Sequence, residues 1–206
     1  MIGVRELCKM EIPSWGSNDP YFQKKTWNIM GFDRTIGYAL IMNILITYRP
    51  VRIEDKEEVL SLFPELADFE LPVQRVAKHL WSGDAEMLCT VLEQKSTVTF
   101  ADVAVDRHGS ILGVIMVTLR EELLSHTPSA HLETIIVAPK ARGNGLGTLL
   151  LERAEQRAFE LGAKSLTLHV FFNNIRARSL YKKHGYEEEL FRCIKWFDSV
   201  PRWGSS

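Results

Sequence analysis

The 206-residue sequence has few cysteines and no long hydrophobic run. Its three cysteines, Cys8, Cys89 and Cys193, are odd in number, far apart and without a C-x-x-C pair, so the pattern predicts free thiols in a reducing compartment. The longest apolar stretch, residues 36–46, is shorter than the roughly 18–20 residues that a membrane span needs. It also lacks the basic flank and cleavage site of a secretion signal. We therefore expect a cytoplasmic protein that is not inserted into a membrane.

The sequence also lacks an excess of charge of either sign. Lys and Arg number 25 and Asp and Glu 26, a formal net charge of −1, so nothing global indicates nucleic acid or an anionic membrane as a partner. The six histidines are scattered and no Cys/His cluster has the spacing of metal ligands, so we expect no metal. Hydrophobic residues make up 46% of the chain, which is enough for the core of one domain.

Hydrophobic patterning separates an irregular beginning from a regular remainder. Residues 1–41 have no sustained period and are predicted to be an N-terminal extension, residues 42–200 a single domain that starts at Met42, and residues 201–206 a flexible tail. The domain is predicted to be a mixed α/β fold around one sheet, in the order β-αα-β-β-β-α-β-α-β. The predicted strands are 44–52, 97–106, 111–119, 131–137, 165–172 and 186–197, and the predicted helices are 54–70, 73–81, 147–161 and 174–184.

A glycine-rich turn between residues 137 and 148 carries the most chemical information. A strand ends there, Gly143, Gly145 and Gly147 alternate, and an amphipathic helix follows directly. Glycines allow a positive φ and close approach to a ligand, and a helix N-terminus offers unpaired N–H groups and the positive end of a dipole. The turn therefore suits a pyrophosphate, although many such turns only connect two elements. It matches neither the G-x-x-x-x-G-K-[ST] loop nor the G-x-G-x-x-G fingerprint.

A second segment, residues 174–186, follows the next predicted strand. Asn174, Ala177 and Tyr181 are spaced i, i+3 and i+7 and so share one helix face. They could be a helix cap and a core tyrosine, or an amide and a phenol that line a ligand.

Together the two segments resemble motifs of the GCN5-related N-acetyltransferase (GNAT) superfamily. Arg142-x-x-Gly145-x-Gly147 resembles the Q/R-x-x-G-x-G/A loop of that family, and Asn174-x-x-Ala177-x-x-Leu180-Tyr181-x-x-x-Gly185-Tyr186 resembles its N-x-x-A-x-x-L-Y-x-x-x-G-F/Y helix. The similarity runs from about Ile44 to Phe197. It implies the acyl-CoA N-acyltransferase fold and transfer of an acetyl group from acetyl-CoA to an amine.

The resemblance also implies which residues bind acetyl-CoA. The strand before the glycine turn would splay from its neighbour, and its backbone at Ile135, Ile136 and Val137 would bind the pantetheine arm. The pyrophosphate would be held by backbone N–H groups of the loop that Arg142 opens, namely those of Gly143, Asn144, Gly145, Leu146, Gly147 and Thr148. Asn174 would contact the cofactor, and Tyr181 would lie beside its sulfur.

Two residues are candidates for proton transfer. A primary amine titrates near ~10.4, so making it nucleophilic at pH 7 costs roughly 4–5 kcal/mol, which a positioned base can share. Glu133 is the predicted base, directly or through water, because an ionisable residue within an apolar strand needs an explanation. It could instead anchor a cationic substrate or face solvent, and His131 and His169 are further candidates for the base. Tyr181 is the predicted acid for the departing thiolate.

The acceptor is predicted to be the primary amine of a small molecule. Leu62–Glu70 is similar to the L-x-x-E-L-A-x-[FY]-E stretch of small-amine, polyamine-like acetyltransferases. Its Glu65, Asp68 and Glu70 could attract a cationic amine or form a solvated face. The alternatives are a protein lysine or N-terminal acetyltransferase, and a non-catalytic acyl-CoA-binding module. Family habit implies a homodimer, for which the apolar residues of 187–197 would be suitable.

Overall fold

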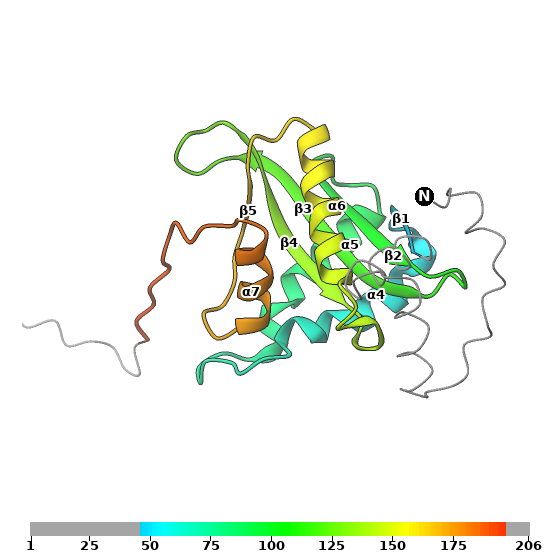
Figure 1. Cartoon of the computed structure of the whole chain (residues 1–206), viewed down its shortest axis with the longest axis horizontal. Helices are drawn as coiled ribbons and strands as arrows, with labels where there is room; N and C mark the ends of the chain where they lie inside the picture. The colour runs from blue at the N-terminus through cyan, green and yellow to red at the C-terminus, as the bar shows by residue number, and fades with distance from the viewer. Residues whose placement is uncertain (1–45, 197–206) are drawn as a thin grey trace, which may run out of the picture. The chain divides into compact units, whose positions relative to one another are not determined.

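The computed structural model describes residues 46–196, and its centre is a five-stranded sheet in the order β1-β2-β3-β4-β5 (Figure 1). Antiparallel pairs join β1 (Thr47–Pro50), β2 (Thr99–Val105), β3 (Ile111–Glu121) and β4 (Pro128–Val137) in succession. The short strand β5 (Leu166–Leu168) runs parallel to β4. The predicted mixed α/β fold around a single sheet is confirmed.

Helices cover both faces of the sheet. Between β1 and β2 lie α4 (Lys56–Leu62) and α5 (Ser82–Leu92), with the 3-10 turns η1 (Ile53–Asp55), η2 (Phe63–Ala67) and η3 (Ala77–Leu80). The turn η4 (Pro139–Ala141) leads toward α6 (Leu146–Glu160), which crosses the opposite face over β3 and β4, and α7 (Ile175–Lys183) follows β5 (Figure 1). No helix within residues 46–196 is both long and apolar enough to cross a membrane.

Each face of the sheet has its own packing. On one face Phe63 and Leu88, both fully buried, pack with Val103, Met116 and other strand residues. On the other face α6 approaches the strands closely at Gly113, where a Cβ atom would lie 2.7 Å from Leu150 Cδ1 and from the carbonyl oxygen of Ile136. A side chain at residue 113 would therefore push α6 away from the sheet.

The predicted strands 97–106 and 111–119 are confirmed as β2 and β3, and a tight hairpin joins them. One carboxylate oxygen of Asp106 accepts hydrogen bonds from the backbone N–H groups of His108 and Ser110, at 2.8 and 2.9 Å. Gly109 has a φ of +83°, which the turn requires and glycine adopts without strain.

Strand β4 contains a β-bulge at Glu133. Thr134 pairs with Met116 and Leu132 with Val117, so Glu133 has no partner on β3. The extra residue shifts the alternation of side chains, so that His131 and Thr134, three residues apart, lie on the same face of the sheet. A bulge of this kind re-aims a side chain at a local kink in the strand.

Four predicted elements, two helices and two strands, differ from the structure. The predicted helix 54–70 is divided into η1, α4 and η2, and Pro64, which has no N–H to donate, lies in the last of these. The predicted helix 73–81 contains only η3, and the helix proper is α5, which was not predicted because its first residues, Ser82 and Gly83, are weak helix formers.

The predicted strand 165–172 is paired only over β5, and the predicted last strand, 186–197, is not a strand over residues 186–196. Those residues find no strand partner in the described part of the chain, and Leu190, Phe191 and Ile194 are 62%, 81% and 52% exposed. Phe197, the predicted extension 1–41 and the predicted tail 201–206 lie outside the described residues.

Candidate functional site

Strands β4 and β5 separate soon after they pair. Their parallel ladder joins Ala130 to Leu166 and Leu132 to Leu168 and goes no further, whereas β4 continues to Val137 and pairs there only with β3. The outer edge of β4 over residues 133–137 thus has no strand beside it in the described structure. An extended ligand with amide groups can pair with such an edge as a strand would. The splay expected from the resemblance is present.

The glycine-rich loop lies at the end of that edge. Gly143 and Gly145 have φ values of +79° and +80°, and Gly145 is the N-cap of α6, whose first bond runs from Leu149 N–H to the carbonyl of Gly145. Among the described residues none accepts a hydrogen bond from the backbone N–H groups of residues 143–148. With the positive end of a 15-residue helix behind them, these donors suit an anion.

Helix α7 presents the residues of the second motif. Asn174 caps the helix, since its side-chain oxygen accepts a hydrogen bond of 3.1 Å from the backbone N–H of Ala177. Tyr181 is only 8% exposed, and burial raises its pKa to about 12, so the phenol carries its proton at neutral pH. His184 Nε2 lies 3.4 Å from Thr148 Oγ1 on α6, which brings the two motifs side by side.

Glu133 lies half-buried at the bulge, and a second carboxylate is close to it. Asp84, in the first turn of α5, accepts a hydrogen bond of 2.9 Å from the hydroxyl of Thr134. Burial raises the pKa of Asp84 and the negative charge of Glu133 raises it further, against the lowering effect of the Thr134 hydrogen bond. The sequence analysis did not identify Asp84, because the helix that carries it, α5, was not predicted. The sequence signal for this residue is an acidic side chain two positions after Ser82, in the first turn of the helix.

His131 is buried and already bonded. Its Nδ1 lies 2.6 Å from Arg120 Nη2 and 2.8 Å from Thr167 Oγ1, and its ring is 4.6 Å from that of His169. Burial, then the charge of Arg120 and the proximity of His169, lower the pKa of His131 to about 4. It is neutral at pH 7 and a weak base, which favours Glu133 for that role. His169 is exposed.

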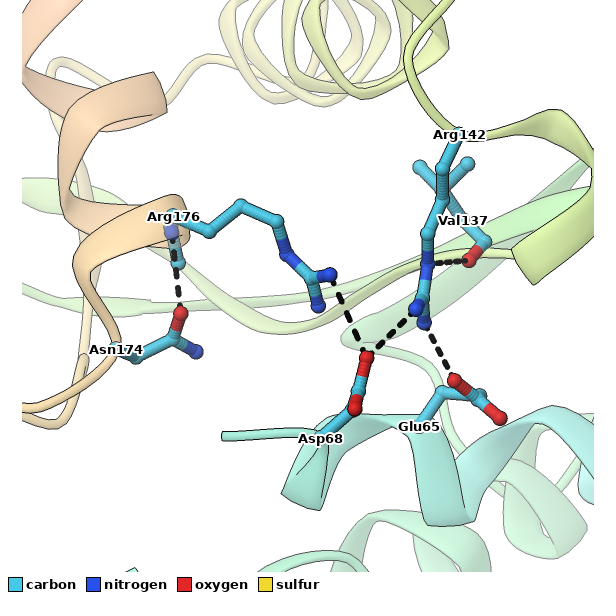
Figure 2. Close-up of polar contacts among 7 residues, drawn as sticks. Glu65, Asp68, Val137, Arg142, Asn174 and Arg176 are labelled. Carbon is cyan, nitrogen blue, oxygen red and sulfur yellow. Dashed lines mark hydrogen bonds and ion pairs between the residues drawn. The ribbon is translucent and has the colours of Figure 1, made fainter. Parts of the chain in front are cut away.

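Two of the three predicted acidic residues of the segment 65–70 form ion pairs with arginines (Figure 2). Arg142 Nη2 lies 2.5 Å from Glu65 Oε2, and its Nη1 lies 2.6 Å from Asp68 Oδ2. Asp68 Oδ2 is also 3.4 Å from Arg176 Nη1 on α7. Glu65 and Asp68 are therefore partners of the loop arginine, and only Glu70 of the three has no ion pair with a described residue.

A parallel strand pair that opens beside a glycine loop and a helix N-terminus is a site that an extended ligand with an anionic group would fit. Residues 60–186 match the sequence profile of the Acetyltransferase (GNAT) family, and the chain belongs to that family. It is an acetyl-CoA-dependent N-acetyltransferase.

Relatives and solved structures agree with this assignment. The chain is 29% identical over 141 residues to the uncharacterized N-acetyltransferase YhfO of Bacillus subtilis, an alignment that covers 68% of this chain and 89% of that protein. It is 28% identical over 89 residues to the aminoalkylphosphonate N-acetyltransferase of Salmonella typhimurium, covering 43% and 58%. A putative acetyl transferase from Pyrococcus furiosus has the same fold, with a TM-score of 0.60, 24% identity and coverage of 74% and 99%.

Proposed function

We propose that this enzyme acetylates the primary amine of a small molecule by direct attack on acetyl-CoA, with Glu133 as base and Tyr181 as acid. The bulge in β4 carries this proposal. It places Glu133 without a strand partner beside Asp84, next to the unpaired edge of β4. Bulges near active sites re-aim a side chain in this way.

The donor substrate fits the groups available on this chain. The backbone of Ile135, Ile136 and Val137 would pair with the pantetheine arm, and the free N–H groups of residues 143–148 would receive the pyrophosphate. Arg142 and Asn174 complete the proposed donor site, at the start of the loop and of α7. Acetyl-CoA supplies an acetyl group activated as a thioester.

The residues in this site would move two protons. Glu133 takes a proton from the ammonium of the acceptor, directly or through water, so that the neutral nitrogen can form the new C–N bond. As the C–S bond breaks, the nitrogen gives its second proton to the phenolate that Tyr181 leaves after protonating the sulfur. Tyr181 faces the leaving thiolate with its proton in place, because its pKa lies near 12. It donates a hydrogen bond and then the proton to sulfur.

A cationic small molecule is the class of acceptor that the charges favour. Glu133 and Asp84 form a pair of carboxylates, and two carboxylates close together gain from a cation between them. Similarity to an aminoalkylphosphonate N-acetyltransferase gives independent support for a small amine.

The test is acetyl-CoA turnover, followed by thiol release, on polyamines, amino acids, aminoalkylphosphonates, aminoglycosides and lysine peptides. We expect turnover of a small amine, and a fall of about 10²-fold or more in kcat for Glu133→Gln and for Tyr181→Phe, since general acid–base groups contribute about that much. Turnover of peptides alone would contradict the small-molecule acceptor. Tight binding of acetyl-CoA without any turnover would indicate the non-catalytic module.

Two variants serve as matched controls. Tyr186→Phe removes a hydroxyl from the ring that lies 5.7 Å from that of Tyr181. Glu121→Gln removes an exposed carboxylate from the end of β3. Both should keep kcat within about twofold, and losses equal to those of the site variants would remove the acid and base assignments.

We also propose that the protein forms a homodimer and that it is cytoplasmic. Exposed apolar side chains at Leu190, Phe191 and Trp196 support burial of this segment against a second copy. Light scattering on the full chain decides the first: a monomeric mass contradicts it.

A further inference from the structure

We propose that Arg142 is a positioning residue for the acceptor side of the site, through an ion-pair network that we call the arginine latch: Arg142, Glu65, Asp68 and Arg176 (Figure 2). The latch ties the acceptor-side segment, residues 63–70, to the glycine loop and to the start of α7. This inference rests on the proposed function, because it assigns that segment to the wall of the acceptor site.

Among the described residues, the side chain of Arg142 has three hydrogen-bond acceptors, and all three lie outside the glycine loop. Its Nε donates to the carbonyl oxygen of Val137 at 3.1 Å, and its two terminal nitrogens reach Asp68 and Glu65 at 2.6 and 2.5 Å. Figure 2 shows the guanidinium extending from the loop past Val137 to the two carboxylates. The planar fork of an arginine suits such a set of acceptors, and a lysine could make only part of it.

The acceptor-side segment is held at both ends. Phe63 is fully buried and Leu66 packs against the core, which fixes the start of the segment. At its other end the ring of Phe69 lies 5.6 Å from that of Phe171, and the carbonyl of Glu70 accepts a hydrogen bond of 3.2 Å from Asn173. Between these anchors, the polar side-chain contacts of the segment with other parts of the described chain are those of the latch.

The latch therefore joins the two sides of the gap between β4 and β5. Arg142 follows β4, whereas Phe171, Asn173 and Arg176 follow β5, and the segment 63–70 reaches residues on both sides. In the proposed reaction the acceptor amine would meet the acetyl group at this gap, with the segment as one of its walls. Its position sets the room and the orientation available to that amine.

Separate measurement of KM for the acceptor and KM for acetyl-CoA tests the proposal. Glu65→Gln and Asp68→Asn should each raise KM for the acceptor about twofold to fivefold, the range for loss of one ion pair near the surface, with KM for acetyl-CoA within about twofold. Arg142→Gln should raise acceptor KM at least as much, and Arg142→Lys should recover part of the loss. Glu70→Gln is the matched control, since it removes the same charge from the same segment and Glu70 forms no ion pair with a residue of the range 46–196.

Hydrogen exchange on the full chain provides a readout that does not depend on turnover. Amides of residues 65–70 should exchange faster in Glu65→Gln and Arg142→Gln than in the wild type, and the double variant should be no faster than Arg142→Gln, because the two changes break one interaction. If no small amine is acetylated but this pattern holds, the proposed function fails and the latch contact stands.

Three results would overturn the inference. Unchanged exchange in all variants would show that the ion pairs do not hold the segment. An equal rise in acceptor KM for Glu70→Gln would show general attraction of a cation instead of positioning. A rise in acetyl-CoA KM alone for Arg142→Gln, with Glu65→Gln and Asp68→Asn unaffected, would leave Arg142 with a phosphate-binding role only.

Discussion

Gly145 and Gly147 occupy the same loop but meet different requirements. Gly145 has a φ of +80°, a conformation that costs other residues roughly 1–2 kcal/mol, whereas Gly147 lies within α6. A Cβ atom on Gly147 would meet Leu180 Cδ2 at 3.6 Å and Val137 Cγ2 at 3.8 Å, which is ordinary contact. Alanine thus fits at 147 and is strained at 145.

We predict that Gly145→Ala lowers the free energy of unfolding by about 1–2 kcal/mol and that Gly147→Ala raises it by up to about 1 kcal/mol, since alanine is the better helix former. Urea denaturation without ligand measures both. Equal losses for the two variants would mean that crowding by α7, and not the backbone angle, decides what these positions tolerate.

Single residues of the site differ in how far the sequence could predict them. The glycine loop and the face of Asn174 and Tyr181 follow from local spacing, and the structure brings them together. The direction of the Arg142 side chain does not, because its partners Asp68 and Glu65 are 74 and 77 residues away. From the sequence pattern, Glu65 and Asp68 could be free to attract a substrate. In the fold both are ion-paired with Arg142.

Helix α6 is attached to the sheet by charge as well as by packing. Asp102 of β2 is fully buried, and its carboxylate bonds to Arg157 and, at 3.0 Å, to Arg153 Nε, both on α6. The two arginines are partly exposed and can reach water if the aspartate is removed. The aspartate has no such alternative if the arginines are removed.

We therefore predict an asymmetry between the two ways of breaking this contact. Asp102→Asn should cost about 1–2 kcal/mol, and the double variant Arg153→Gln/Arg157→Gln about 3–5 kcal/mol, because it leaves a buried carboxylate unpaired. Guanidinium denaturation compares them, with the exposed Arg107→Gln as a control that should change little. A larger cost for Asp102→Asn than for the double variant would contradict this explanation.

Whole elements were predictable where pattern and turn chemistry agreed. Helix α6 has an apolar stripe behind a glycine turn, and the β2–β3 hairpin has Asp106 and Gly109 in its turn; both were found. Helix α5 begins with weak helix formers, and the sequence pattern does not predict it. The predicted strand 186–197 rested on apolar content alone, and a strand also needs a neighbour to pair with, which sequence pattern cannot supply.

Over the whole molecule, the buried histidine links stability to pH. His131 has a pKa of about 4 in the folded protein and about 6.5 when exposed in an unfolded chain. Between these values the unfolded state binds more protons than the folded state, so stability rises with pH across that window and is level above it. The neutral imidazole faces Arg120, Thr167 and His169, and none of these partners would favour a proton on it.

Between pH 7 and pH 5 we expect the free energy of unfolding to fall by about 2 kcal/mol because of His131. This follows from a slope of about 1.4 kcal/mol per pH unit for one proton. His131→Gln lowers stability at pH 7, because it disturbs a buried contact, but its stability should fall less between pH 7 and pH 5 than that of the wild type. His169→Gln is the control: His169 contributes the smallest of the three causes that lower the pKa of His131, so its loss should change the pH slope much less than His131→Gln does. Urea denaturation at half-unit steps of pH gives the three slopes. Parallel curves for the wild type and His131→Gln would mean that carboxylates elsewhere in the fold, and not this histidine, set the acid sensitivity of the protein.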